Sequence, residues 1–210
     1  MQKTATVLGA LLLLLAPQNR TGASGDARTL SFYHTHTGKE LTVTYFENGD
    51  YLPDGLARLE NYLSDWRNGH RHQMDPELMD FLWRIQLNAR HVDTWEVISA
   101  YRSPETNAML RKKSNGVARK SQHLEGKAID VRLRGLDTRR LQQVALDLKL
   151  GGVGYYEKSD FVHVDTGRVT RWKTISKNTQ ENPWFETESY PYPRRSGRTA
   201  PRSRHPARAG

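Results

Sequence analysis

The chain has 210 residues, carries a formal net charge of +9 and contains no cysteine. This length suits one domain with extensions, and a hydrophobic content of 36% is enough for a core, which excludes a wholly disordered chain. The lack of cysteine excludes disulfides, thiolate metal sites, a cysteine nucleophile and anchoring through a lipid-modified cysteine.

The positive charge is concentrated at the two ends of the chain. Six arginines and no acidic residue lie within residues 194–210, while Lys3 and Arg20 precede residue 23. The middle of the chain is therefore left with a charge of about +1, too little to indicate a nucleic-acid-binding domain.

Residues 1–23 have the pattern of an export signal. Lys3 precedes an apolar run over residues 5–16, and Thr21–Ala23 supplies small residues for cleavage. The run is shorter than the roughly 20 residues that span a bilayer. We expect export to the periplasm of a bacterium by the general secretory route, since no arginine pair precedes the run. An uncleaved membrane anchor is the alternative.

The first part of the mature chain predicts a β-hairpin. Leu30–His34 and Leu41–Phe46 are rich in β-branched and aromatic residues, and Thr37–Lys39 is suited to a turn between them. His34 and His36 are two residues apart and share one face of a strand. They are either metal ligands or a surface pair on the hairpin, and the second interpretation is favoured.

Two helices are expected next. Leucines at helical spacing predict one over Asp54–Trp66, and Asp75 followed by Pro76 has the residue types of a cap and first position for another. Between them, His70 and His72 lie in an arginine-containing polar stretch. We interpret it as a solvated loop rather than a ligand pair.

The second half predicts alternating strands and helices. The expected strands are Trp95–Ala100, Lys127–Leu133, Val153–Tyr156 and Phe161–Asp165. Ser103 and Asp137 cap the expected helices, which run to about Lys113, before a stop at Ser114–Gly116, and to Gly151. These elements predict an α+β domain over residues 24–175, with a small, mostly antiparallel sheet flanked by helices. Residues 176–210, rich in proline and arginine, are expected to be a disordered basic tail.

Three side chains from two places in the chain suggest a metal site. His123 and Asp130 are seven residues apart with Gly126 between them, where the backbone must turn, and His163 lies on a neighbouring expected strand. Two imidazoles and a carboxylate suit Zn²⁺ and leave a fourth position for water, as in catalytic zinc sites. From spacing alone, ordinary polar residues of a sheet remain an equal alternative.

The motif Ser-x-His-x-x-Gly-x-Ala-x-Asp over Ser121–Asp130 resembles the first zinc motif of the D-alanyl-D-alanine peptidases. That superfamily also holds the vancomycin-resistance dipeptidases and the hedgehog signalling domain. Residues 30–172 are most similar to its periplasmic murein endopeptidase branch through this motif and Tyr101–Asn107, Gly151–Tyr156 and Phe161–Gly167. The resemblance implies one zinc ion held by His123, Asp130 and His163 on the sheet face, and attack on a peptide cross-link of peptidoglycan.

The resemblance also implies roles for residues around the metal. Arg102 stands where the family has an arginine, and its planar guanidinium suits a carboxylate of the stem peptide. Ser121 is expected to hydrogen-bond near the site, to a ligand or to the substrate. Phe161 stands where many relatives have a histidine, so the general base is open.

Three acidic residues compete for the role of general base. Asp160 precedes His163 by three residues, where other relatives have an acid, and is preferred. Asp165 follows His163 by two and is either the base or a residue that orients a ligand. Glu157 is a weaker candidate.

These features predict a zinc-dependent murein endopeptidase that acts in cell-wall remodelling. The alternatives are a non-catalytic, zinc-containing domain that binds the cell wall or a partner, and a D-Ala-D-Ala-type carboxypeptidase. For the basic tail, the expected partner is an anionic envelope polymer or lipid headgroups rather than nucleic acid.

Overall fold

The computed structural model describes residues 26–113 and 117–174. The expected export signal, the expected helix stop at Ser114–Gly116 and the basic tail over residues 176–210 all lie outside these ranges. Within the described ranges, no helix is both long and apolar enough to cross a membrane.

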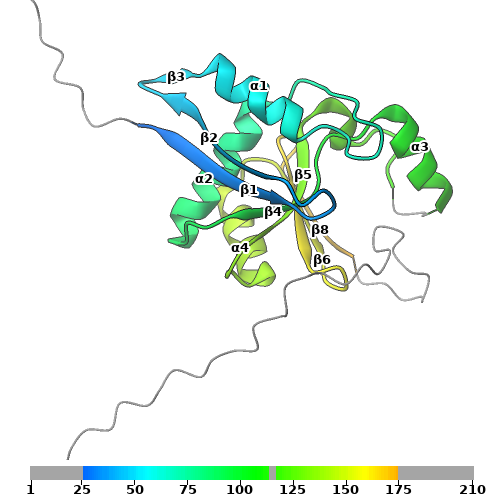
Figure 1. Ribbon diagram of the computed structural model, residues 1–210. Helices are drawn as coiled ribbons and strands as arrows, with labels where there is room; N and C mark the ends of the chain where they lie inside the picture. The colour runs from blue at the N-terminus through cyan, green and yellow to red at the C-terminus, as the bar shows by residue number, and fades with distance from the viewer. Residues whose placement is uncertain (1–25, 114–116, 175–210) are drawn as a thin grey trace, which may run out of the picture.

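The described ranges contain eight strands and four α-helices, whose arrangement is drawn in Figure 1. The strands are β1 (Arg28–His34), β2 (Glu40–Glu47), β3 (Asp50–Tyr51), β4 (Trp95–Ser99), β5 (Ala128–Leu133), β6 (Gly152–Tyr156), β7 (Phe161–Asp165) and β8 (Thr170–Thr174). The helices are α1 (Pro53–Tyr62), α2 (Pro76–Ala89), α3 (Pro104–Lys113) and α4 (Thr138–Leu148), with a 3₁₀ turn η1 (Gln122–Glu125). The α+β class expected from the sequence is confirmed.

All the strands form one sheet in the order β3-β2-β1-β4-β5-β7-β6-β8. β1 pairs with β4 and β6 with β8 in parallel, so the sheet is mixed. The small, mostly antiparallel sheet expected from the sequence is therefore wrong. Turn residues reveal hairpins between consecutive strands, whereas both parallel pairings join strands that are separated along the chain by other elements.

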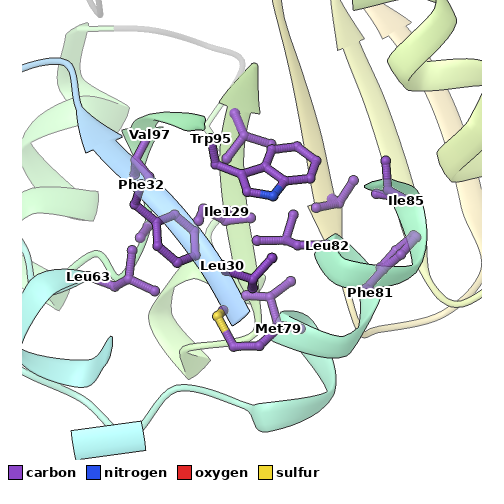
Figure 2. Close-up of a cluster of buried hydrophobic side chains, with 14 of the residues drawn as sticks. Leu30, Phe32, Leu63, Met79, Phe81, Leu82, Ile85, Trp95, Val97 and Ile129 are labelled. Atoms are coloured by element: carbon purple, nitrogen blue, oxygen red, sulfur yellow. The ribbon is translucent and has the colours of Figure 1, made fainter. Parts of the chain in front are cut away.

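The hydrophobic core lies between the sheet and the helices that cover it. α2 and α4 lie together on one side of the sheet (Figure 1), and α1 packs against β2. Figure 2 shows the centre of this core, where Trp95 of β4 and Ile129 of β5 lie close to Leu82 of α2. Each of these three side chains is fully buried. The core fixes which face of β5 is apolar and leaves the opposite face for polar residues.

The helix expected over Asp54–Trp66 is too long at its carboxyl end, since α1 ends at Tyr62. Asp65 is 1% exposed, and its carboxylate accepts hydrogen bonds from the backbone N–H groups of Ser103 and Arg67 at 2.9 and 3.1 Å. A carboxylate that serves as a cap for a distant segment favours a loop over a further helical turn. This loop brings the segment after α1 against the residues that follow β4.

Two other expectations change. His34 is 2% exposed rather than on the surface, because β1 is an interior strand between β2 and β4, while His36 beyond the strand is exposed. α4 ends at Leu148, with Lys149 in a left-handed conformation, so Gly151 is not its end. β8 has no counterpart among the expected strands.

Candidate metal centre

His123 is presented by a short turn that the local sequence explains. Ser121 caps η1, its hydroxyl accepting from the backbone N–H of His123 at 3.4 Å. Gly126 ends the turn with φ of +65°, and a Cβ there would lie 2.2 Å from the carbonyl oxygen of Gln73. The turn therefore requires glycine both for its backbone angle and for the close approach of another segment.

Asp130 and His163 face each other across adjacent strands. β5 and β7 pair antiparallel with Asp130 opposite His163, so both side chains project from the same face of the sheet. On the other face, Ile129 and Val131 join the hydrophobic core. The apolar alternation along β5 is thus what directs the carboxylate toward the histidines.

The three side chains expected to bind zinc converge within the described part of the chain. His123 Nε2 lies 3.3 Å from Asp130 Oδ2 and 3.2 Å from His163 Nδ1, and His163 Nδ1 lies 2.9 Å from Asp130 Oδ1. One donor atom from each residue lies within 4.8 Å of the others, and all three residues are buried. Such a group has the composition and compactness of a metal centre.

The ring nitrogens that face away from this cluster are both hydrogen-bonded. His123 Nδ1 lies 2.6 Å from the carbonyl oxygen of Ala100, and His163 Nε2 lies 3.0 Å from Asp165 Oδ2. Both partners accept, so these nitrogens carry the hydrogens in a neutral ring. The lone pairs of His123 Nε2 and His163 Nδ1 are then directed into the cluster, as metal ligation needs.

Electrostatics in the cluster favours a cation at its centre. Burial alone would raise the pKa of Asp130, but the charge of His123 and hydrogen bonds from both imidazoles lower it below the ordinary range. Burial opposes protonation of His163, yet hydrogen bonds to Asp130 and Asp165 raise its pKa to about 9. Burial, with Arg102 nearby, lowers the pKa of His123. A metal ion that binds here would displace the proton of His163, whose ring lies between the carboxylates of Asp130 and Asp165.

Arg102 lines the same centre from the end of β4. Its Nη2 lies 3.9 Å from Asp130 Oδ2, and its Nη1 donates to Asn107 Oδ1 at 3.3 Å. Its backbone N–H also donates to the carbonyl oxygen of His123 at 3.1 Å. Arg102 as a residue is 5% exposed, so its guanidinium is a fixed positive charge beside the centre.

Asp165 is tied to the centre through His163. Its Oδ1 accepts from the backbone N–H groups of Gly152 and Gly167 at 3.2 and 2.8 Å, while its Oδ2 binds His163. Gly152 allows this approach, because a Cβ there would lie 2.3 Å from Asp165 Oδ2. Of the two roles that the sequence left open for Asp165, these contacts match the orientation of a ligand.

Asp160 and Glu157 have partners elsewhere. Asp160 Oδ1 accepts from the Thr138 hydroxyl at 2.6 Å, at the start of α4, and its Oδ2 lies 3.9 Å from Arg132 Nε. Glu157 pairs with Arg139. The structure therefore brings Asp165 to the metal centre but directs the preferred base candidate, Asp160, toward α4.

Two aromatic residues beside the centre were not predicted from the sequence as part of the site. The Trp172 ring lies 5.1 Å from that of His163, over Gly154, where a Cβ would come within 2.3 Å of it. Tyr156 follows Gly154 by two on β6 and so shares its face. The two-residue period of the strand could have placed Tyr156 on this face from the sequence. The position of Trp172 depends on the parallel strand β8, which was not predicted.

Comparison with known proteins is consistent with this geometry. A family model described as "Peptidoglycan L,D-endopeptidase MepK" matches residues 22–172. The peptidoglycan L,D-endopeptidase MepK of Escherichia coli K12 is 37% identical over 165 residues, which cover 79% of this chain and 90% of that protein. The probable peptidoglycan L,D-endopeptidase MepK of Haemophilus influenzae is 41% identical over 150 residues, covering 70% and 80%. No solved structure matches.

Proposed function

The chain belongs to the peptidoglycan L,D-endopeptidase MepK family, and on that premise we propose that it is a zinc-dependent peptidase that cleaves L,D peptide cross-links in bacterial peptidoglycan. The observation that carries the proposal is the buried cluster of His123, Asp130 and His163, with one nitrogen of each imidazole facing into it and the other hydrogen-bonded outside it. An endopeptidase fits better than the carboxypeptidase considered from the sequence, because the relatives are named as endopeptidases.

The donor set fits zinc. Two neutral imidazole nitrogens and one carboxylate oxygen are the ligands of many catalytic zinc sites, and each histidine has the outer hydrogen bond that such ligands usually make. Zinc in such a site acts as a Lewis acid and makes water nucleophilic near neutral pH. The choice of zinc among metals of similar preference rests on this donor chemistry.

The residues around the cluster have separate roles in binding the substrate and in holding the metal ligands. Arg102 offers a bidentate partner for a carboxylate of the stem peptide, next to the metal ligand Asp130. Asp165 orients His163, and Ser121 supports His123 by capping η1. Asp160 stays a candidate base on the sequence alone, since its contacts in the fold are to Thr138 and Arg132.

Cleavage of defined cross-linked muropeptide dimers tests the proposal. The purified protein should cut an L,D-linked dimer, lose this activity with a chelator and regain it with zinc. His123→Ala should abolish zinc binding and cleavage, while His70→Ala, at an exposed loop position, should leave both unchanged. Survival of the L,D-linked dimer in the presence of zinc would overturn the proposal. Stoichiometric binding of zinc and peptidoglycan without turnover would instead select the non-catalytic binding domain.

We further propose a periplasmic location and an auxiliary role for the basic tail. The location rests on the export pattern of residues 1–23, and N-terminal sequencing of protein from the periplasmic fraction tests it. The tail is proposed to bind an anionic envelope polymer or lipid headgroups by its six arginines. Deletion of the residues after Tyr192 should then weaken binding to such surfaces at low salt and leave turnover of soluble muropeptides intact. A collapse of soluble turnover would show instead that the tail belongs to the domain.

A further inference from the structure

The hydroxyl of Tyr156 has no role in the mechanism above, although it contacts Trp172, whose ring packs beside His163. On β6, Tyr156 is on the same face as Gly154, which pairs with His163 across β7. Asp130 pairs with His163 from the other side of β7, so Tyr156, His163 and Asp130 project from one face of the sheet. The residue is only partly buried.

Two neighbours fix the orientation of that hydroxyl. The Tyr156 ring stacks on Phe161, with centroids 4.4 Å apart and an interplanar angle of 15°. The indole N–H of Trp172 donates to the Tyr156 oxygen at 3.4 Å. Because an indole nitrogen only donates, the phenol accepts this bond and keeps its own proton for another acceptor.

Trp172 is itself held in place by β8. This strand pairs in parallel with β6, with Trp172 opposite Gly154, and the missing side chain of Gly154 leaves the space that the indole occupies. The same ring packs 5.1 Å from His163. One indole thus touches both a metal ligand and the tyrosine, and keeps the phenol at a set position relative to the centre.

We propose that Tyr156 is a catalytic residue that donates a hydrogen bond to the carbonyl oxygen of the scissile amide as it becomes an oxyanion, and that Trp172 is its positioning residue. This inference rests on the proposed peptidase function. A prearranged donor aimed at charge that develops in the transition state is among the strongest contributions to peptide hydrolysis. Burial and the charge of Asp130 raise the pKa of Tyr156, so the phenol stays protonated and able to donate at neutral pH.

Steady-state kinetics on an L,D-linked muropeptide dimer tests the assignment. Tyr156→Phe keeps the stacking on Phe161 and removes only the donor, so kcat should fall about a hundredfold with little change in KM. Trp172→Phe keeps an aromatic ring over Gly154 but removes the N–H, and should lower kcat by roughly tenfold with zinc content unchanged. The double variant should be no slower than Tyr156→Phe, since Trp172 acts through that hydroxyl.

Tyr155→Phe is the matched control, because it removes a hydroxyl from the opposite, core-facing side of the same strand and should leave kcat unchanged. A second readout is the calorimetric affinity of the zinc-loaded protein for a phosphinate analogue of the cross-link, whose tetrahedral anion resembles the transition state. Tyr156→Phe should weaken this affinity about a hundredfold.

The two proposals fail in different ways. If the wild-type protein cleaves the dimer but Tyr156→Phe retains kcat and phosphinate affinity within about threefold, the role of Tyr156 is wrong and the peptidase function stands. If the wild-type protein neither cleaves the dimer nor binds the phosphinate, both are overturned. If it binds the phosphinate without cleavage, the affinity of Tyr156→Phe still decides the role of the hydroxyl.

Discussion

His163 is held at both ring nitrogens, and this sets how it serves the metal centre. Nδ1 points toward Asp130 and His123, while Nε2 is bonded to Asp165, whose other oxygen is fixed by two backbone N–H groups. The ring therefore has one orientation before any ion binds, and loss of the Nδ1 proton would free the lone pair that a metal takes. We propose that Asp165 would act on a bound metal through the ring it holds.

Asp165→Asn should weaken metal affinity by about 10–100-fold, because the amide loses the charge that orients and polarises His163. Competition with a chromogenic chelator measures this affinity. Asp160→Asn is the matched control, since the same change at a carboxylate bonded to Thr138 leaves the metal ligands untouched and should keep affinity within about twofold. Equal losses in the two variants would contradict the orienting role of Asp165.

At the scale of elements, the turn from η1 into β5 joins the metal site to the rest of the domain. The carbonyl of Gly126 accepts from the backbone N–H of Asp75, the cap of α2, and Asp75 also accepts from the Thr166 hydroxyl at 2.7 Å. The start of α2 is thus bonded to the segments that carry His123 and His163, the two proposed histidine ligands. Packing of α2 on the core and the position of His123 are therefore coupled.

Gly126→Ala should destabilise the fold by about 1–3 kcal/mol, because alanine combines a strained left-handed angle with a clash against Gln73. Gly38→Ala is the control, since Gly38 has a similar φ of +66° with nothing within 4 Å of the added Cβ. It should cost about 1 kcal/mol from strain alone. Urea denaturation of the metal-free proteins measures both, and an equal cost at the two glycines would exclude the contact with Gln73 as the cause.

At the scale of the whole molecule, the position of β1 inside the sheet buries a titratable ring. His34 is 2% exposed, and burial, together with the charges of His36, Lys39 and Arg67, lowers its pKa to about 4. In the unfolded chain the value returns to about 6.5, so the unfolded state takes up a proton first as the pH falls. Stability from neutral His34 is complete above pH 6.5 and is lost between pH 6.5 and 4.

His34→Gln should remove up to about 3 kcal/mol of this pH dependence, because the substituted side chain does not titrate. Free energies of unfolding measured in chelator at pH 7 and pH 4.5 test this, with the difference between the two values as the readout. His70→Gln, at an exposed histidine, is the control and should keep the wild-type difference. An unchanged difference in His34→Gln would mean that another group causes the acid sensitivity.

Much of the secondary structure was predictable because its signals are local. The caps at Asp75, Ser103 and Asp137 and the alternation along β5 each act over a few residues, and all are confirmed. The end of α1 was not predictable, since it depends on Asp65 bonding to Ser103, which is 38 residues away in the chain. Long-range pairing likewise decided both parallel strand contacts.

The sequence by itself determined which side chains could form a metal site, because His123, Gly126 and Asp130 form a compact motif and His163 lies on a recognisable strand. Only the tertiary structure decided which atoms face inward, since the hydrogen bonds of His123 to Ala100 and of His163 to Asp165 cross between segments. It also turned Asp160 toward α4 and brought Tyr156 and Trp172 to the site. Residue types and spacing define the possible ligands, whereas the register of neighbouring strands sets their directions in space.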